Sequence, residues 1–182
     1  MLGIVLVTGE FRHGTITPTF LVTPVRERVL AAKLAFGVAG GIALAVLALL
    51  IVAAVAVPWL LALGDPLSLD GDTVQKAAEV VLQAALWAAL GVAIGAAVQG
   101  QVAALLGTLI WVLVAETLIS ALLSVLDLDR VARFLPNAAL SAVVGEGADD
   151  RLTFVPALLV SLGWIALVGT IGLVRTQRTD VT

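Results

Sequence analysis

The sequence predicts an all-α integral membrane protein, a bundle of four complete transmembrane helices, and three observations support this class. Of its 182 residues, 61% are hydrophobic and 13% are charged, whereas a soluble domain is about 45–50% apolar and about 25% charged. The apolar residues lack the strict alternation of a barrel strand. Four stretches are long enough for a helix to cross a bilayer, which takes about 20 residues. They are 34–63, 74–98, 102–126 and 154–174.

The composition also argues against several classes of function. The net charge is −3 and there is no basic patch, which argues against nucleic-acid binding. The chain has no cysteine and one histidine, so cysteine nucleophiles and thiolate or multi-histidine metal sites are not expected. Neither Lys33 nor Lys76 belongs to a G-x-x-x-x-G-K-[ST] motif. We therefore expect no catalytic, cofactor or metal site in this chain.

Residues 1–8 are apolar but too short to cross a bilayer, since eight helical residues reach about 12 Å. The segment also lacks the charged region and the cleavage site of a signal peptide. We expect a short N-terminal helix stub, the remnant of a preceding span.

The orientation of the bundle follows from its Lys and Arg residues. The side with residues 9–33, the turn at 99–101 and the tail from Arg175 carries six of them and three acidic residues. The other side carries four basic and nine acidic residues. Because Lys and Arg are enriched on the cytoplasmic side of membrane proteins, we expect residues 9–33 and the C-terminus in the cytoplasm.

Residues 9–33 are predicted to form a cytoplasmic amphipathic segment that leads into the first full span. Thr17-Pro18 and Thr23-Pro24 each have the form of an N-cap followed by proline at the first helical position. The apolar residues of the segment can enter the lipid interface while its charges stay in water. An ordinary juxtamembrane anchor is the alternative interpretation.

Glu116 is the sharpest polar feature inside a predicted span. It lies near the middle of 102–126, where a charged carboxylate costs ~2.5–3.5 kcal/mol on insertion scales. This cost predicts that Glu116 faces protein or a water-filled cavity, or is protonated. Two interpretations stay open: a translocation-path or gating residue, and a structural hydrogen bond to a neighbouring helix, aided by Thr117 or Ser120.

Three further polar residues, Gln75, Glu79 and Gln83, recur every four positions and share one face of the outer half of the second span. This stripe could line an outer vestibule, with Gln83 as the deepest and best candidate. The alternative is a solvated helix end above the membrane.

The external segment 127–153 is apolar enough to touch lipid but too short to cross it, and Pro136 interrupts it. We expect two short external interfacial helices that cap the bundle, with a re-entrant loop as the alternative.

Glycines are expected to bring helices into close contact. Gly37 and Gly41, and again Gly91 and Gly95, match the G-x-x-x-G pattern, which we interpret as helix packing within the chain rather than as a dimer face. The tight turn at 99–101 predicts that the second and third spans form an antiparallel hairpin.

A set of residues in the cytoplasmic segment closely resembles the ABC-2 type transporter permeases, in which E-x-R-x-G-T precedes a Thr-Pro pair and a lysine at the foot of the next helix. The matching residues are Glu10, Arg12, Gly14, Thr15, Thr23, Pro24, Arg26 and Lys33. The stretch 86–116 resembles the family's fourth and fifth helices, and Phe134-Leu135-Pro136 resembles its external segment. The segment GEFRHGTITPTFLVTP is most similar to actinobacterial members.

The resemblance implies that residues 1–182 form a single permease domain of an ATP-driven exporter in the bacterial plasma membrane. It would pair with a second permease copy or a homologue and with ABC ATP-binding subunits, which would bind ATP and Mg. In the family the cytoplasmic stretch docks on that ATPase. The coupling residues implied here are Glu10, Arg12, His13, Thr15, Thr23 and Arg26. The residues expected on the translocation path are Glu116 and Gln83.

The family has six spans, and two of them precede the cytoplasmic stretch. Here the first is absent and the second survives at most as residues 1–8, so we expect an N-terminally truncated permease. The rival interpretation, from another class, is a non-transporting membrane scaffold or assembly protein derived from such a permease.

Overall fold

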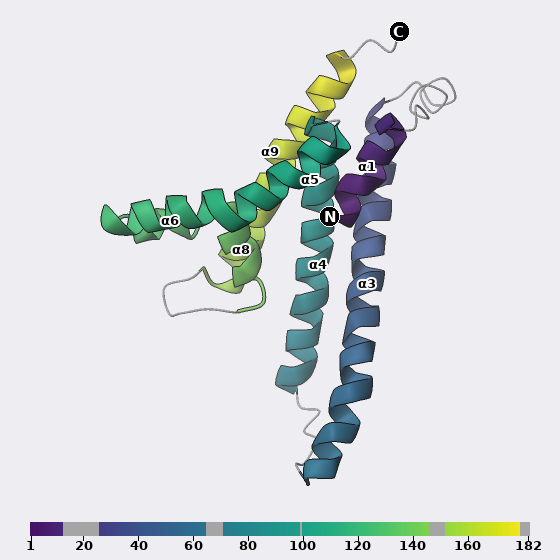
Figure 1. Ribbon diagram of the computed structural model, residues 1–182, viewed down its shortest axis with the longest axis vertical. Coiled ribbons are helices and arrows are strands. Elements are labelled where there is room, and N and C mark those ends of the chain that lie inside the picture. The colour runs from purple at the N-terminus through teal and green to yellow at the C-terminus, as the bar shows by residue number, and fades with distance from the viewer. Residues whose placement is uncertain (13–25, 65–70, 99, 146–151, 179–182) are drawn as a thin grey trace.

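The computed structural model describes residues 1–12, 26–64, 71–98, 100–145 and 152–178. Every regular element in these ranges is a helix (Figure 1). The elements are α1 (Leu2–Arg12), α3 (Arg26–Leu63), α4 (Gly71–Val98), α5 (Gln101–Ile110), the π-helix η1 (Trp111–Ala115), α6 (Glu116–Val125), α7 (Asp129–Ala132), α8 (Pro136–Ala142) and α9 (Phe154–Arg178).

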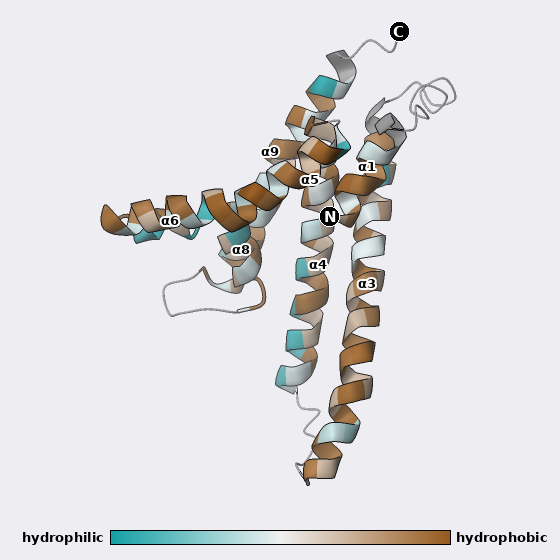
Figure 2. Cartoon of the chain, viewed as in Figure 1, coloured by the Kyte–Doolittle hydropathy of each residue, from teal (hydrophilic) through white to brown (hydrophobic). Residues whose placement is uncertain are grey.

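Four helical stretches in the described part are long and apolar enough to cross a membrane, which confirms the prediction of four such helices. They are Arg28–Leu63, Gly71–Val98, Gln101–Val125 and Phe154–Thr176. Figure 2 shows that α3 is apolar along most of its length, whereas the lower part of α4 carries hydrophilic residues. Buried positions make up 61% of the most apolar part of α4, but 11 to 17% in the other three stretches. Thus α4 is the central helix, and the others present apolar side chains to lipid.

Small residues allow the neighbouring helices to approach α4 closely. A Cβ atom on Gly37 would lie 2.6 Å from Val92 Cγ2, and one on Gly41 would lie 2.7 Å from Ala88 Cβ. A Cβ on Gly95 of α4 would lie 3.1 Å from Ile4 O of α1. Both G-x-x-x-G patterns therefore serve helix packing within the chain, as predicted: the first joins α3 to α4 and the second joins α1 to α4.

Helix α1 extends beyond the predicted stub of residues 1–8 and packs firmly into the bundle. Ile4, Val7 and Thr8 are buried, and the Thr8 hydroxyl donates to Ile4 O at 2.8 Å within the helix. A Cβ on Gly3 would overlap Ala88 O, so the backbones of α1 and α4 are in direct contact. The first four residues of the predicted cytoplasmic segment thus continue α1.

The third span diverges from α4 instead of pairing with it along its full length. The predicted tight turn is present, since Gly100 N donates to Val98 O at 2.7 Å. After the turn α5 contacts α1 and α4, but α6 then runs away from α4 (Figure 1). The predicted hairpin is therefore restricted to α5.

Two short helices, α7 and α8, occupy the predicted external segment, but α8 does not lie at the end of the bundle. Leu140, Ala142 and Val143 belong to a buried cluster with Leu86 and Leu90 of α4. Helix α8 therefore packs along the side of α4 instead of capping the bundle as predicted. Gly145, with a φ of 63°, follows α8 in the left-handed conformation that commonly ends helices.

Candidate functional site

The carboxylate of Glu116 lies at the N-terminus of α8. Its Oε2 accepts a hydrogen bond from Asn137 N at 3.1 Å, and its Oε1 accepts one from Ala138 N at 2.8 Å. The Glu116 residue is only 3% exposed. Since Leu135 at the N-cap offers no side-chain acceptor, a residue of the third span supplies the negative group that helix N-termini favour.

This geometry gives the predicted intramembrane carboxylate a defined structural role. Glu116 does make a structural hydrogen bond, but its partner is the short helix α8 rather than one of the four long apolar helices. Thr117, one of the two expected helpers, instead donates to Leu113 O at 3.2 Å within its own helix.

The π-helix η1 directly precedes this carboxylate. The Glu116 N–H donates to Trp111 O, five residues earlier, instead of to the residue four earlier as in an α-helix. The additional residue changes the helical register between α5 and α6 and thereby sets the face on which Glu116 lies. Single π-turns inside α-helices are rare and are frequent at functional sites.

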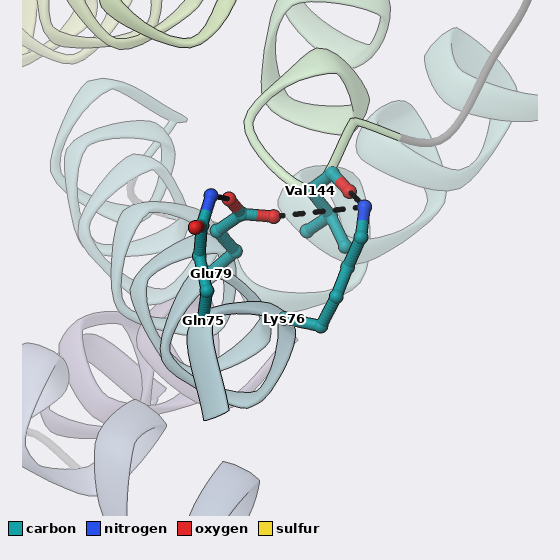
Figure 3. Close-up of polar contacts among 4 residues, drawn as sticks. All are labelled: Gln75, Lys76, Glu79 and Val144. Atoms are coloured by element: carbon teal, nitrogen blue, oxygen red, sulfur yellow. Dashed lines mark hydrogen bonds and ion pairs between the residues drawn. The ribbon is translucent and has the colours of Figure 1, made fainter. Parts of the chain in front are cut away.

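The other end of α8 is held by polar residues of α4. Gln83 Nε2 donates to Leu140 O at 3.0 Å, and Lys76 Nζ donates to Val144 O at 2.8 Å (Figure 3). Glu79 Oε2 lies 3.8 Å from the same ammonium, and Gln75 Nε2 donates to Glu79 Oε1 at 2.8 Å. Of the predicted stripe, Gln83 therefore contacts α8 directly. Glu79 contacts Lys76, which holds α8, and Gln75 contacts Glu79.

We define Glu116, Gln83 and Lys76 as the α8 clamp. An anionic group meets the N-terminal amides of α8, and an amide and an ammonium meet the carbonyls at its C-terminal end, which matches the direction of the helix dipole. Sequence reasoning missed Lys76, although its spacing of three residues from Glu79 is a recognised signal for a helical ion pair.

An apolar pocket of about 230 Å³ lies beside the α8 clamp. Three of the chain's four tryptophans line it, each from a different span. The Trp164 indole also donates to Phe134 O at 2.9 Å, which holds the chain just before α8. The lining residues are Trp87, Leu90, Ile94, Gly107, Thr108, Trp111, Val112, Pro136, Trp164 and Val168. Sequence reasoning missed this site, whose only signal was tryptophan in the middle of spans instead of at the membrane interface.

Three of the six predicted coupling residues lie outside the described part of the structure. Glu10 and Arg12 belong to α1 and Arg26 begins α3, but their side chains are not described. His13, Thr15 and Thr23 fall in 13–25, outside the described residues.

The structure does describe the helices on either side of 13–25, namely α1 and α3. The C-terminal ends of α1, α4 and α9 and the N-terminal end of α3 lie at one end of the molecule (Figure 1). At this end Arg175 Nη1 donates to Ala97 O at 2.7 Å, so a cation meets the C-terminus of α4.

Among the described residues, no group of three or more His, Cys, Asp or Glu could hold a metal ion. Comparisons with protein-family models, with curated proteins and with solved structures found no match for this chain. The fold and the site thus define a multi-pass helical membrane protein in which a short helix, α8, is clamped beside an apolar pocket.

Proposed function

We propose that this protein is the membrane-spanning permease subunit of an ATP-driven exporter of the ABC-2 type. ATP and Mg would be bound by a partner ATPase, and a second permease copy or a homologue would complete the transporter. Residues 9–33 and the C-terminus would face the cytoplasm of a bacterial cell. One observation carries the proposal: α1 and α3, which flank the coupling segment, both pack directly on α4.

The packing provides a mechanical connection from the coupling segment to the membrane interior. At the contacts made by Gly3 and Gly41, no side chain separates one helix backbone from the atoms of the next. Because close-packed interiors transmit displacement instead of absorbing it, a push on residues 10–24 would move α4 together with α1 and α3.

From α4 the connection continues to α8. Gln83 and Lys76 join α4 to the C-terminal end of α8, while Glu116 joins the third span to its N-terminal end. A movement of α4 relative to α6 would therefore pull on both ends of α8 through the hydrogen bonds of the clamp. In this proposal the polar residues Gln83, Lys76 and Glu116 couple helix movement to α8.

The orientation can be tested directly because the chain contains no cysteine. Single cysteines would be introduced by Lys33→Cys and Asp72→Cys, and intact cells would be treated with a membrane-impermeant maleimide. We expect labelling at position 72 and none at position 33 until the cells are permeabilised. The reverse pattern would place the coupling segment outside the cell and overturn the proposal.

The partner can be tested by affinity purification from the native host in a mild detergent, followed by mass spectrometry. We expect a Walker-type ATPase to copurify and Arg12→Glu to release it. The matched control is Arg178→Glu, because Arg178 is also cytoplasmic in the proposed orientation but lies outside residues 10–24. Absence of any nucleotide-binding partner would favour the non-transporting scaffold.

A further inference from the structure

We infer that the apolar pocket beside the α8 clamp is a binding site for a compact, uncharged aromatic molecule. If the proposed function holds, this chemistry also defines the substrate class of the exporter, and that extension rests on the proposed function. The binding itself is a property of this chain alone.

The size of the pocket is sufficient for such a ligand. Its volume is about 230 Å³ and it is open on one side, whereas enclosed engineered apolar cavities of ~150 Å³ already hold benzene. The pocket therefore has room for an aromatic molecule of two fused rings. Five elements contribute to its lining, namely α4, α5, η1, α8 and α9.

The lining selects against charged and strongly polar ligands. No charged side chain belongs to it. The Thr108 hydroxyl already donates to Ala104 O at 2.7 Å, and the Trp164 indole N–H already donates to Phe134 O. A ligand that required charge pairing would lose its hydration without gaining a partner.

The tryptophans favour an aromatic ligand over an acyl chain. Trp87, Trp111 and Trp164 come from three different helices and converge on one pocket. Aromatic rings gain an additional stabilisation from offset or edge-to-face contacts with each other, beyond the burial of apolar area. An acyl chain offers no such contact.

The wall that α8 contributes is held in a defined position. Pro136 lines the pocket, and the next two residues donate their amides to Glu116. On the other side of Pro136, Phe134 O accepts the Trp164 indole N–H. The pocket is thus bordered by hydrogen bonds on both sides of Pro136, which gives it a fixed shape.

The test uses the full chain in nanodiscs with 1-bromonaphthalene as the probe. Trp59→Phe would remove the one tryptophan outside the pocket, so that fluorescence reports only on the three lining indoles. We expect saturable quenching. Gly107→Leu should weaken it at least tenfold, because Gly107 lines the pocket and has open space for a side chain.

The matched control is Gly163→Leu, since Gly163 also has open space around it but does not line the pocket. It should leave the quenching unchanged. A second blocking variant, Val112→Phe, would decide the result if Gly107→Leu did not fold, as judged by circular dichroism.

Three results would overturn the inference. Quenching that rises linearly with probe concentration would indicate partition into lipid only. Equal binding by the blocked variants and by Gly163→Leu would place the probe elsewhere. Full competition by dodecane at concentrations equal to that of the probe would assign the pocket to acyl chains. Because no ATPase is present, failure here is distinguishable from failure of the proposed function.

Discussion

Replacement of Glu116 by alanine should release α8 without removing a membrane span. In the native protein the carboxylate accepts the amides of Asn137 and Ala138 at 3.1 and 2.8 Å. When α8 opens, the carboxylate is left in the apolar interior and both amides lose their partner. In the alanine variant the closed state already lacks these bonds, so opening costs less.

The magnitude follows from the number of bonds. A hydrogen bond to a charged group contributes about 1.5–3 kcal/mol, so two such bonds contribute about 3 kcal/mol at the lower end of that range. Each 1.4 kcal/mol corresponds to a factor of about ten in an equilibrium constant. The opening equilibrium of α8 should therefore increase about 100-fold. Glu116→Gln keeps one neutral acceptor, which contributes about 1 kcal/mol, so about 2 kcal/mol is lost and the opening equilibrium should increase about 30-fold.

The assay is amide hydrogen–deuterium exchange in nanodiscs, measured by mass spectrometry on peptides that cover 134–144. Exchange of α8 reports on local opening and does not require global unfolding. Thr117→Val is the matched control, because the Thr117 hydroxyl bonds only within its own helix at 3.2 Å to Leu113 O. Unchanged exchange of α8 in Glu116→Ala, or equal acceleration in Thr117→Val, would refute the clamp.

The remaining predictions concern the α4 contacts. Gly3→Ala should lower the free energy of unfolding by about 1–3 kcal/mol in chemical denaturation, because its Cβ would overlap the α4 backbone. Gly9→Ala, which has open space, should be neutral or slightly stabilising, and a loss equal to that of Gly3→Ala would contradict the packing. Lys76→Met should cost less than about 1 kcal/mol, because its side chain is 60% exposed. Gln83→Leu, which leaves a partly buried carbonyl without its donor, should cost about 1 kcal/mol and should accelerate exchange of α8, whereas unaltered exchange would remove Gln83 from the clamp.

The membrane helices could be predicted from sequence because their signal is local. A run of about 20 apolar residues has few alternatives to a spanning helix, and the G-x-x-x-G pairs predict close packing from residue size alone. The cost of a carboxylate at mid-membrane likewise singled out Glu116 before its partner was known.

The site could be predicted only in part, because its remaining features depend on contacts between distant segments. Nothing in residues 111–115 indicates a π-turn, although that turn sets the face of Glu116. Pro136 correctly predicted a break in the external segment. The position of α8 beside α4 depends on hydrogen bonds with Glu116 and Gln83. Both residues lie 20 or more positions from their α8 partners in the sequence. The three pocket tryptophans are likewise brought together only by the fold.

The unequal environments of α3 and α4 have a consequence for biogenesis. The α3 stretch has a mean hydropathy of 2.8 with 11% of its most apolar part buried, whereas the α4 stretch has 2.0 with 61% buried. A nascent α3 can therefore leave the translocon for lipid unaided. The more polar α4 is synthesised next, when α3 is already in the membrane and available as a packing partner. The order of the two helices along the polypeptide therefore suits the order of assembly.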